Sequence, residues 1–180
     1  MLHALLLTLS LSSQTAGPID ITEQELTQYV NQKAKYQQQY GLPGLFDVDL
    51  NIDSMQVRLG RQKANMAQVL SNGRFTLTLP GQPAVDGTIT ADFEAKPRYH
   101  LQNGAIYLDN FMLTSYQIKP ATVQEQFAPL VGYLVQGLQS RLEQQPAYVL
   151  NTKDKEQLWL KQHVTRFELL PGKLRLHTDK

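Results

Sequence analysis

The 180-residue sequence contains no cysteine. This absence excludes disulfide frameworks, cysteine-ligated zinc, iron–sulfur clusters, thiol nucleophiles and the attachment of lipid through a cysteine. Charged residues are also few, at 18%, and 17 Lys and Arg nearly balance 16 Asp and Glu. Because no basic block is present to neutralise phosphates, the composition argues against a nucleic-acid partner. Glutamine, with 21 copies, supplies many of the polar side chains instead.

The length suits one domain behind a processed leader, since domains most often run about 100 to 150 residues. We expect a leader over residues 1–16 and a single domain over residues 17–180. Residues 2–11 form an apolar run that is far shorter than the roughly 20 residues of a membrane-spanning helix. Small and polar residues follow it, as in a signal peptide, although the usual basic start is missing. The alternative interpretation of this run is a buried N-terminal helix or strand.

Apolar residues at helical spacing predict a first helix over residues 23–39. Thr22 and Glu25 are spaced as a capping box, in which the Thr22 hydroxyl accepts from the Glu25 amide and the Glu25 carboxylate accepts from the Thr22 amide. Gly41 and Pro43 end the helical pattern.

After this helix the apolar period changes to two, which is typical of strands with one buried and one wet face. Four long runs predict an antiparallel meander, with strands that begin near residues 46, 69, 85 and 106. The apolar phase slips after Asp53 and again near Asp109 and Ser115, which predicts bulges that bend the sheet. Turn signals at Pro80-Gly81 and Asn103-Gly104 separate the strands.

The most regular helix is predicted over residues 122–143. Thr122 and Glu125 predict a second capping box at its start, and Pro129 predicts a kink inside it. Because the sheet has one apolar face that must be covered, we expect this helix to pack on it. The helix carries a continuous apolar stripe: Val123, Phe127, Leu130, Val131, Leu134, Val135, Leu138 and Leu142.

The rest of the chain is predicted to be short elements. They are a short strand or extended link at 147–150, a third helix that is capped by Asn151 or Thr152 and contains Leu158, Trp159 and Val164, and a terminal strand that contains Leu174 and Leu176. Trp159 between lysines could contact a membrane surface, but core packing with snorkelling lysines is the favoured interpretation. The predicted fold class is therefore α+β, with a bent antiparallel meander covered by a long amphipathic helix.

Motifs for catalysis are missing. The sequence has no G-x-S-x-G elbow, no phosphate-binding glycine loop and no H-E-x-x-H. Asp47 and Asp49 are predicted on a solvated strand face, which offers no contrast of environment for acid–base catalysis, and the same face lacks the glycine and glutamate of a calcium loop. The four histidines share no metal-binding spacing: His3, His100, His163 and His177. We expect no enzyme activity, no cofactor and no metal.

Four segments carry a family resemblance. In chain order they are ITEQEL at 21–26, GLPG at 41–44, GAIYL at 104–108 and QQPAYVL at 144–150. Together they resemble the YceB-like lipoproteins of Gram-negative bacteria from about Ile21 to the C-terminus. That family resembles the tubular lipid-binding (TULIP) superfamily, so the resemblance implies a strongly curved sheet wrapped around the long helix, with a groove that can hold lipid. The implication of lipid binding comes from the resemblance alone.

The leader departs from the family pattern. YceB-like proteins typically carry an acylated lipobox cysteine at the end of the leader, and residues 10–17, SLSSQTAG, contain none. The chain is then either a soluble periplasmic member or one whose leader has been altered.

The sequence patterns and the family resemblance together predict a periplasmic, non-enzymatic monomer, and the resemblance implies that it binds a lipid or another long apolar molecule between the 122–143 helix and the concave face of the sheet. Such a site gains about 0.8 kcal/mol per buried methylene and needs few polar contacts. The expected lining residues are Phe127, Leu130, Val131, Leu134 and Leu138 on the helix, and Val85, Ile89, Phe93, Leu108 and Phe111 on strands. The alternative is a self-packed interaction module that docks an envelope partner, and a hydrolase ranks third.

Overall fold

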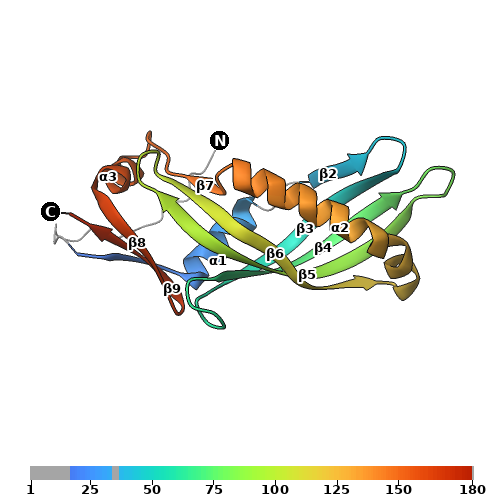
Figure 1. Cartoon of the computed structure of the whole chain (residues 1–180), viewed down its shortest axis with the longest axis horizontal. Coiled ribbons are helices and arrows are strands. Elements are labelled where there is room, and N and C mark those ends of the chain that lie inside the picture. The colour runs from blue at the N-terminus through green and yellow to red at the C-terminus, as the bar shows by residue number, and fades with distance from the viewer. Residues whose placement is uncertain (1–16, 34–36, 180) are drawn as a thin grey trace.

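The computed structural model describes residues 17–33 and 37–179, so the predicted leader lies outside the described residues. Within these ranges the chain forms a six-stranded antiparallel sheet of order β2-β3-β4-β5-β6-β7 and a three-stranded sheet of order β1-β9-β8 (Figure 1). The elements in chain order are β1 (Ile19–Thr22), α1 (Glu23–Lys33), β2 (Gln37–Leu42), β3 (Phe46–Leu59), β4 (Ala67–Thr78), β5 (Val85–His100), β6 (Ala105–Lys119), α2 (Ala121–Gln144), β7 (Tyr148–Val149), α3 (Lys155–His163), β8 (Val164–Leu170) and β9 (Lys173–Thr178).

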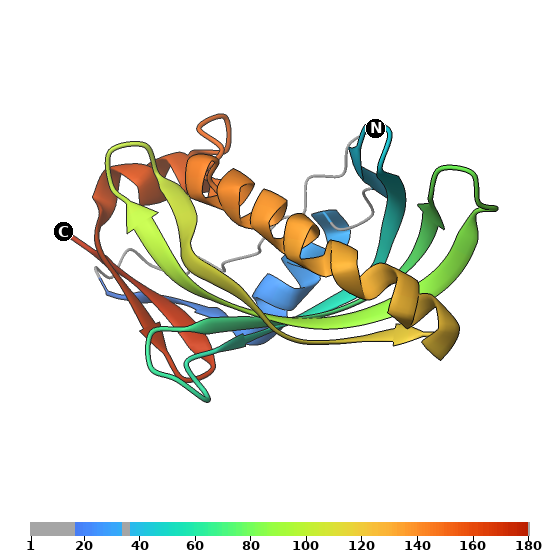
Figure 2. The same cartoon turned by 45° about the vertical axis from the view of Figure 1, so that its right-hand side comes forward.

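The large sheet curves around α2, and the predicted fold class is confirmed (Figures 1 and 2). Its bulges fall where the apolar phase of the sequence slips. The pairing of β3 with β4 shifts between Ile52 and Ser54, and the pairing of β5 with β6 shifts twice, once at Thr114 and once around Asn110. Each bulge adds an unpaired residue and increases the local twist, which bends long strands toward the helix.

The first capping box is confirmed, but the first helix is shorter than predicted. The backbone N–H of Thr22 donates to the Glu25 carboxylate at 2.7 Å, and the Glu25 N–H donates to the Thr22 hydroxyl at 3.2 Å. The helix ends at Lys33, and the predicted helix over 23–39 is wrong at its C-terminal end because 37–42 form β2. Pairing of every β2 residue with β3 outweighs the helix propensity of the glutamines.

Helix α1 completes the edge of β3 where β2 does not reach. Three α1 side chains, spaced four residues apart, bond to the backbone of alternate β3 residues at 2.6 to 3.0 Å: Glu23 to Leu59, Thr27 to Val57 and Asn31 to Met55. Four residues of helix advance about 6 Å, close to the advance of two residues of strand. Because the two spacings match, the α1 side chains accept hydrogen bonds from backbone N–H groups on this edge of β3, which would otherwise be free to pair with another strand.

The start of α2 also differs from the prediction. The helix begins at Ala121, with Pro120 at the N-cap and no side-chain cap, so the second capping box at Thr122 and Glu125 is wrong. The Pro120 carbonyl instead accepts the backbone N–H of Val123 at 3.0 Å. Once the first turn is closed this way, Thr122 lies inside the helix, where its hydroxyl cannot act as a cap.

The three-stranded sheet contains two strands that were not predicted, β1 near the start of the described chain and β8 near its end, and both pair with β9. The cap of α3 is Asp154, whose carboxylate accepts the backbone N–H groups of Glu156 and Gln157 at 2.9 and 3.2 Å, so the predicted cap at Asn151 or Thr152 is wrong. Val164 begins β8 and does not belong to the helix. A short strand has too few residues to show a clear alternation of its own, so it is recognised only from the strand with which it pairs. For β1 that strand is β9, which lies far away in the sequence.

The buried side chains form two separate clusters. One lies between the three-stranded sheet, α3 and the far ends of β3 and β4: Val57, Leu59, Ala67, Leu160, Val164, Leu169, Leu174 and Leu176. The other lies between the start of α2 and the opposite ends of the same strands: Phe46, Val48, Phe75, Leu77, Ile118, Val123 and Phe127. Neither cluster completely fills the space between α2 and the middle of the sheet.

Candidate functional site

An apolar cavity of about 90 Å³ lies between α2 and the inner face of the large sheet. Every residue that lines it has an aliphatic or aromatic side chain. Strands β3, β5 and β6 contribute Val48, Leu50, Ile89, Ala91, Phe93, Leu113 and Tyr116, and α2 contributes Phe127, Val131, Leu134, Val135 and Leu138. Apart from the Tyr116 hydroxyl, the side chains of the lining offer no hydrogen-bonding group, and a space of this kind favours an apolar occupant.

The cavity exists because inward-facing positions in the middle of two strands are small. Ser71 and Gly73 on β4 and Ala91 on β5 are buried on the same face as the larger core residues. The Ser71 hydroxyl donates to the Ala91 carbonyl at 3.1 Å, so it leaves no free donor under the helix. Of these three residues Ala91 lines the cavity directly, so a larger side chain there would extend into the space. At Gly73 a Cβ atom would lie only 2.8 Å from the Asn51 backbone oxygen.

Two aromatic pairs bound the cavity along β5. At one side the Phe75 ring packs on Phe127, with centroids 4.6 Å apart, and covers Gly87, where a Cβ atom would lie 2.5 Å from that ring. At the other side Phe93 stacks on Phe111 at 5.0 Å. The rings hold the two ends, and the β5 segment between them faces the cavity.

The roof of the cavity is the less buried part of α2. Val123 and Phe127, near the start of the helix, are buried. Beyond Pro129 the residues of the same apolar stripe are only half-buried: Leu130, Val131, Leu134, Val135, Leu138 and Leu142. Pro129 offers no N–H to the preceding turn, which weakens the helix at the boundary between the two parts. We call residues 130–142 the α2 roof.

Of the ten residues expected to line the groove, six line the cavity: Phe127, Val131, Leu134, Leu138, Ile89 and Phe93. Leu130 and Val85 pack against the neighbouring buried cluster instead. Phe111 supports Phe93 from behind, and Leu108 does not line the cavity. Val48, Leu50 and Leu113 were missed although they lie in the predicted apolar runs, because the sequence does not tell which turn of the helix faces which strand residue.

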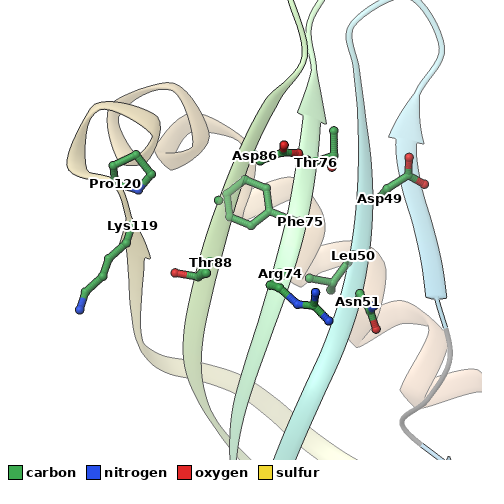
Figure 3. Close-up of a pocket in the computed structure, with 11 residues that line it drawn as sticks. Asp49, Leu50, Asn51, Arg74, Phe75, Thr76, Asp86, Thr88, Lys119 and Pro120 are labelled. Carbon is green, nitrogen blue, oxygen red and sulfur yellow. Dashed lines mark hydrogen bonds between the residues drawn. The ribbon is translucent and has the colours of Figure 1, made fainter.

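A larger hollow, of about 900 Å³, lies on the opposite face of the same strands (Figure 3). Its side chains are mostly polar and carry both signs of charge, including Asp49, Asp86 and Lys119. Arg74 is already held by the Asp53 carboxylate at 2.7 Å. An open surface of mixed charge gives little binding energy to an apolar molecule, so the smaller cavity is the better candidate despite the difference in volume.

Ionisable groups with shifted pKa values lie outside the cavity. Hydrogen bonds from Arg175 and then Lys173 hold the pKa of Asp20 well below its usual range. The Lys63 ammonium, at 2.7 Å, likewise lowers the pKa of the buried Glu94 carboxyl. Each of these carboxylates is paired with cations across neighbouring strands or turns, which is the arrangement of a structural ion pair.

The histidines of the described chain have local partners. His100 lies 3.1 Å from the Asn103 amide oxygen, and His177 lies 2.9 Å from Glu168. Residues 17–33 and 37–179 contain no group of three potential metal ligands. His3 lies outside these ranges.

Trp159 does not pack in the core, so the favoured interpretation of this residue was wrong. Its side chain is 38% exposed and stacks on His163, with ring centroids 4.5 Å apart. The next residue, Leu160, is the one that faces the core, and successive helical residues point about 100° apart.

Within the described ranges, none of the helices combines the length and the hydropathy that crossing a bilayer requires.

The described chain is an α+β protein with an apolar cavity between a curved antiparallel sheet and one long helix. It belongs to the family described as "Protein of unknown function (DUF1439)", whose profile matches residues 21–173.

Two relatives are both named "Uncharacterized lipoprotein YceB". The one from Salmonella typhimurium is 28% identical over 156 residues, which cover 86% of this chain and 83% of the relative. The one from Escherichia coli is 26% identical over the same shares. These matches confirm the resemblance to YceB-like proteins that the four segments indicated.

A solved structure described as "Crystal structure of lipopolysaccharide binding protein" is also similar, with a TM-score of 0.39 and 11% identity. The match covers 89% of this chain and 40% of that chain. A likeness at this level does not transfer a ligand from one protein to the other.

Proposed function

We propose that this protein binds a lipid or another long apolar molecule, without catalysis, between the α2 roof and the inner face of the sheet. The observation that carries the proposal is the purely apolar cavity under a half-buried apolar helix. Residues 17–180 would act as one binding domain. The relatives are named as lipoproteins, which supports a place for this chain in the bacterial envelope. That the chain is a soluble periplasmic monomer is part of the same proposal.

The size of the cavity requires the roof to move. Sites for small molecules usually enclose about 300 to 1,000 Å³, and this cavity has about 90 Å³. The leucines of the α2 roof are only half-buried, so few packing contacts are lost when the roof moves away from the sheet. The buried Phe127 side chain keeps the start of the helix in place. Ten buried methylenes of an acyl chain would contribute about 8 kcal/mol, which can offset the free energy needed to lift the roof from the sheet.

The competing proposal is a self-packed module that docks an envelope partner. The small volume of the cavity favours it, because a rigid roof would leave no room for an acyl chain. The two proposals differ in whether an acyl chain enters the protein, so ligand uptake separates them.

Native mass spectrometry with delipidated protein and oleic acid as the probe tests uptake. We expect one oleate per chain for the wild type and strongly reduced uptake for Leu134→Trp, because the larger ring fills the cavity from the roof. Tyr133→Trp is the matched control, since Tyr133 is adjacent, 61% exposed and outside the cavity lining. Wild-type protein that takes up no oleate, or uptake that Leu134→Trp leaves unchanged, contradicts the proposed site.

A further inference from the structure

Two turns project from the same end of the large sheet. The β2–β3 turn (residues 42–45) and the β4–β5 turn (residues 79–84) lie at the end opposite the β5–β6 turn, α3 and the three-stranded sheet (Figures 1 and 2). A hollow of about 540 Å³ lies between them and is lined by residues of both turns. We call this pair of turns the apolar tips.

The apolar tips expose hydrophobic side chains and carry no ionisable group. Residues 42–46 and 78–85 contain no Asp, Glu, Lys, Arg or His. Leu45 is 64% exposed, more than any other large hydrophobic side chain of the described residues, and Leu42 is exposed beside it. Glycines with positive φ, Gly44 at 80° and Gly81 at 74°, hold both turns in tight shapes that other residues rarely adopt. The leucines are therefore presented to solvent by a fixed backbone.

The shape and the charge of this end favour a lipid surface over a protein partner. A stable protein interface usually buries about 800 Å² per partner with close complementarity, whereas here two separate protrusions flank a hollow. Mobile lipid headgroups can fill such a hollow, and tips without charges enter the headgroup region without desolvating an ion. The ionisable residues nearest in sequence to the two turns are Asp47 and Asp86, on the adjoining strands. Asp47 lines the hollow and accepts a hydrogen bond from Gln39 at 2.9 Å.

From these observations we infer that the apolar tips dock the protein on the surface of a lipid bilayer with uncharged or zwitterionic headgroups. The leucines enter the interfacial region, and Asp47 in the hollow faces the polar, hydrated headgroups and not the acyl chains. This inference rests on other residues than the proposed ligand site and does not depend on ligand uptake. It also assigns membrane contact to the end of the molecule opposite α3, the helix that contains Trp159 (Figure 1).

Co-flotation of the full chain with phosphatidylcholine vesicles tests the inference. We expect Leu45→Asp to lower the partition coefficient at least about tenfold, which corresponds to about 1.4 kcal/mol. Leu101→Asp is the matched control, because Leu101 is a leucine of similar exposure, 50%, on the turn at the other end. It should bind vesicles as the wild type does, and all three proteins share the same N-terminal segment. Binding should change little between about 0.05 and about 0.5 M salt.

Equal melting temperatures of the three proteins would show that both aspartates leave the fold intact. The inference is overturned if the wild type does not float, if Leu45→Asp floats as well as the wild type, or if Leu101→Asp is impaired to the same extent. It is also overturned if binding rises with anionic lipid and falls with salt, since basic residues elsewhere would then be responsible. Loss of self-association in Leu45→Asp without any vesicle binding would assign the tips to a second copy of the chain.

Discussion

The two parts of α2 follow one apolar pattern and yet differ in burial. Phe127, before Pro129, is only 2% exposed, whereas Leu134 and Leu138 on the roof are half-buried. All three belong to the same stripe at helical spacing. A periodic pattern thus identifies the face that a helix turns toward the core, but it does not determine how completely that face is covered.

The difference in burial comes from the size of the strand side chains that face the two parts of α2. Opposite the start of α2 lie large side chains such as Phe75 and Ile118, which close around Phe127. Inward positions further along β4 and β5 hold Ser71, Gly73 and Ala91, which are too small to reach the roof. Tight packing costs free energy to disrupt, whereas a small cavity under a half-buried helix can be opened or filled.

The largest expected effect compares truncations in the two parts of the helix. Phe127→Ala should lower the free energy of unfolding by about 3 to 5 kcal/mol, because it removes a fully buried ring and its contact with Phe75. Leu138→Ala should cost less, about 1 to 2 kcal/mol, since its side chain is already partly in water. Urea denaturation followed by circular dichroism measures both values. Equal losses would mean that the two parts are equally packed.

A second comparison fills the cavity from the sheet. Ala91→Leu places three carbon atoms into the cavity, so we expect stabilisation by about 0.5 to 2 kcal/mol together with loss of oleate uptake. Ala95→Leu is the control on the same strand: Ala95 is as buried but does not line the cavity, and overpacking there should cost about 1 to 3 kcal/mol. Thermal unfolding combined with the uptake assay tests the pair. If Ala91→Leu destabilises as much as Ala95→Leu does, the cavity offers no usable space.

The smallest expected effect concerns the glycines of the roof. Gly132 and Gly137 lie inside the helix, and a Cβ atom at either position would meet nothing within 4 Å. Gly132→Ala and Gly137→Ala should each stabilise the protein by about 0.5 to 1 kcal/mol, because alanine has the higher helix propensity. Hydrogen exchange should show the gain in residues 130–142, whereas the amides around Phe127 should be unaffected. A gain spread evenly over the whole helix would argue against two independent parts.

Much of the sheet could be predicted from the sequence, because each strand shows its own alternation and each bulge shifts it. The slip after Asp53 coincides with the shift between Ile52 and Ser54. Elements that depend on distant partners could not be predicted. Residues 37–42 become a strand only through pairing with β3, and β8 requires β9.

Part of the candidate site could also be predicted from the sequence. The stripe on α2 identified Val131 and Leu134, since helical spacing alone places them on one face. Leu108 was expected to line the groove but does not, because its position depends on the register between α2 and β6. How the helix sits over the strands follows from tertiary packing, which no local pattern encodes.

Because the chain has no cysteine, pairs of introduced cysteines can carry spin labels without further changes. Thr88 on the outer face of β5 is a common reference point, with Gln136 on the roof and Gln124 near the start of α2 as its partners, and all three are exposed. The central claim is that the roof lifts while the start of the helix stays in place. We predict that oleate lengthens the distance from Thr88→Cys to Gln136→Cys by several ångströms and leaves the distance from Thr88→Cys to Gln124→Cys unchanged. Oleate that binds with both distances unchanged would contradict the claim.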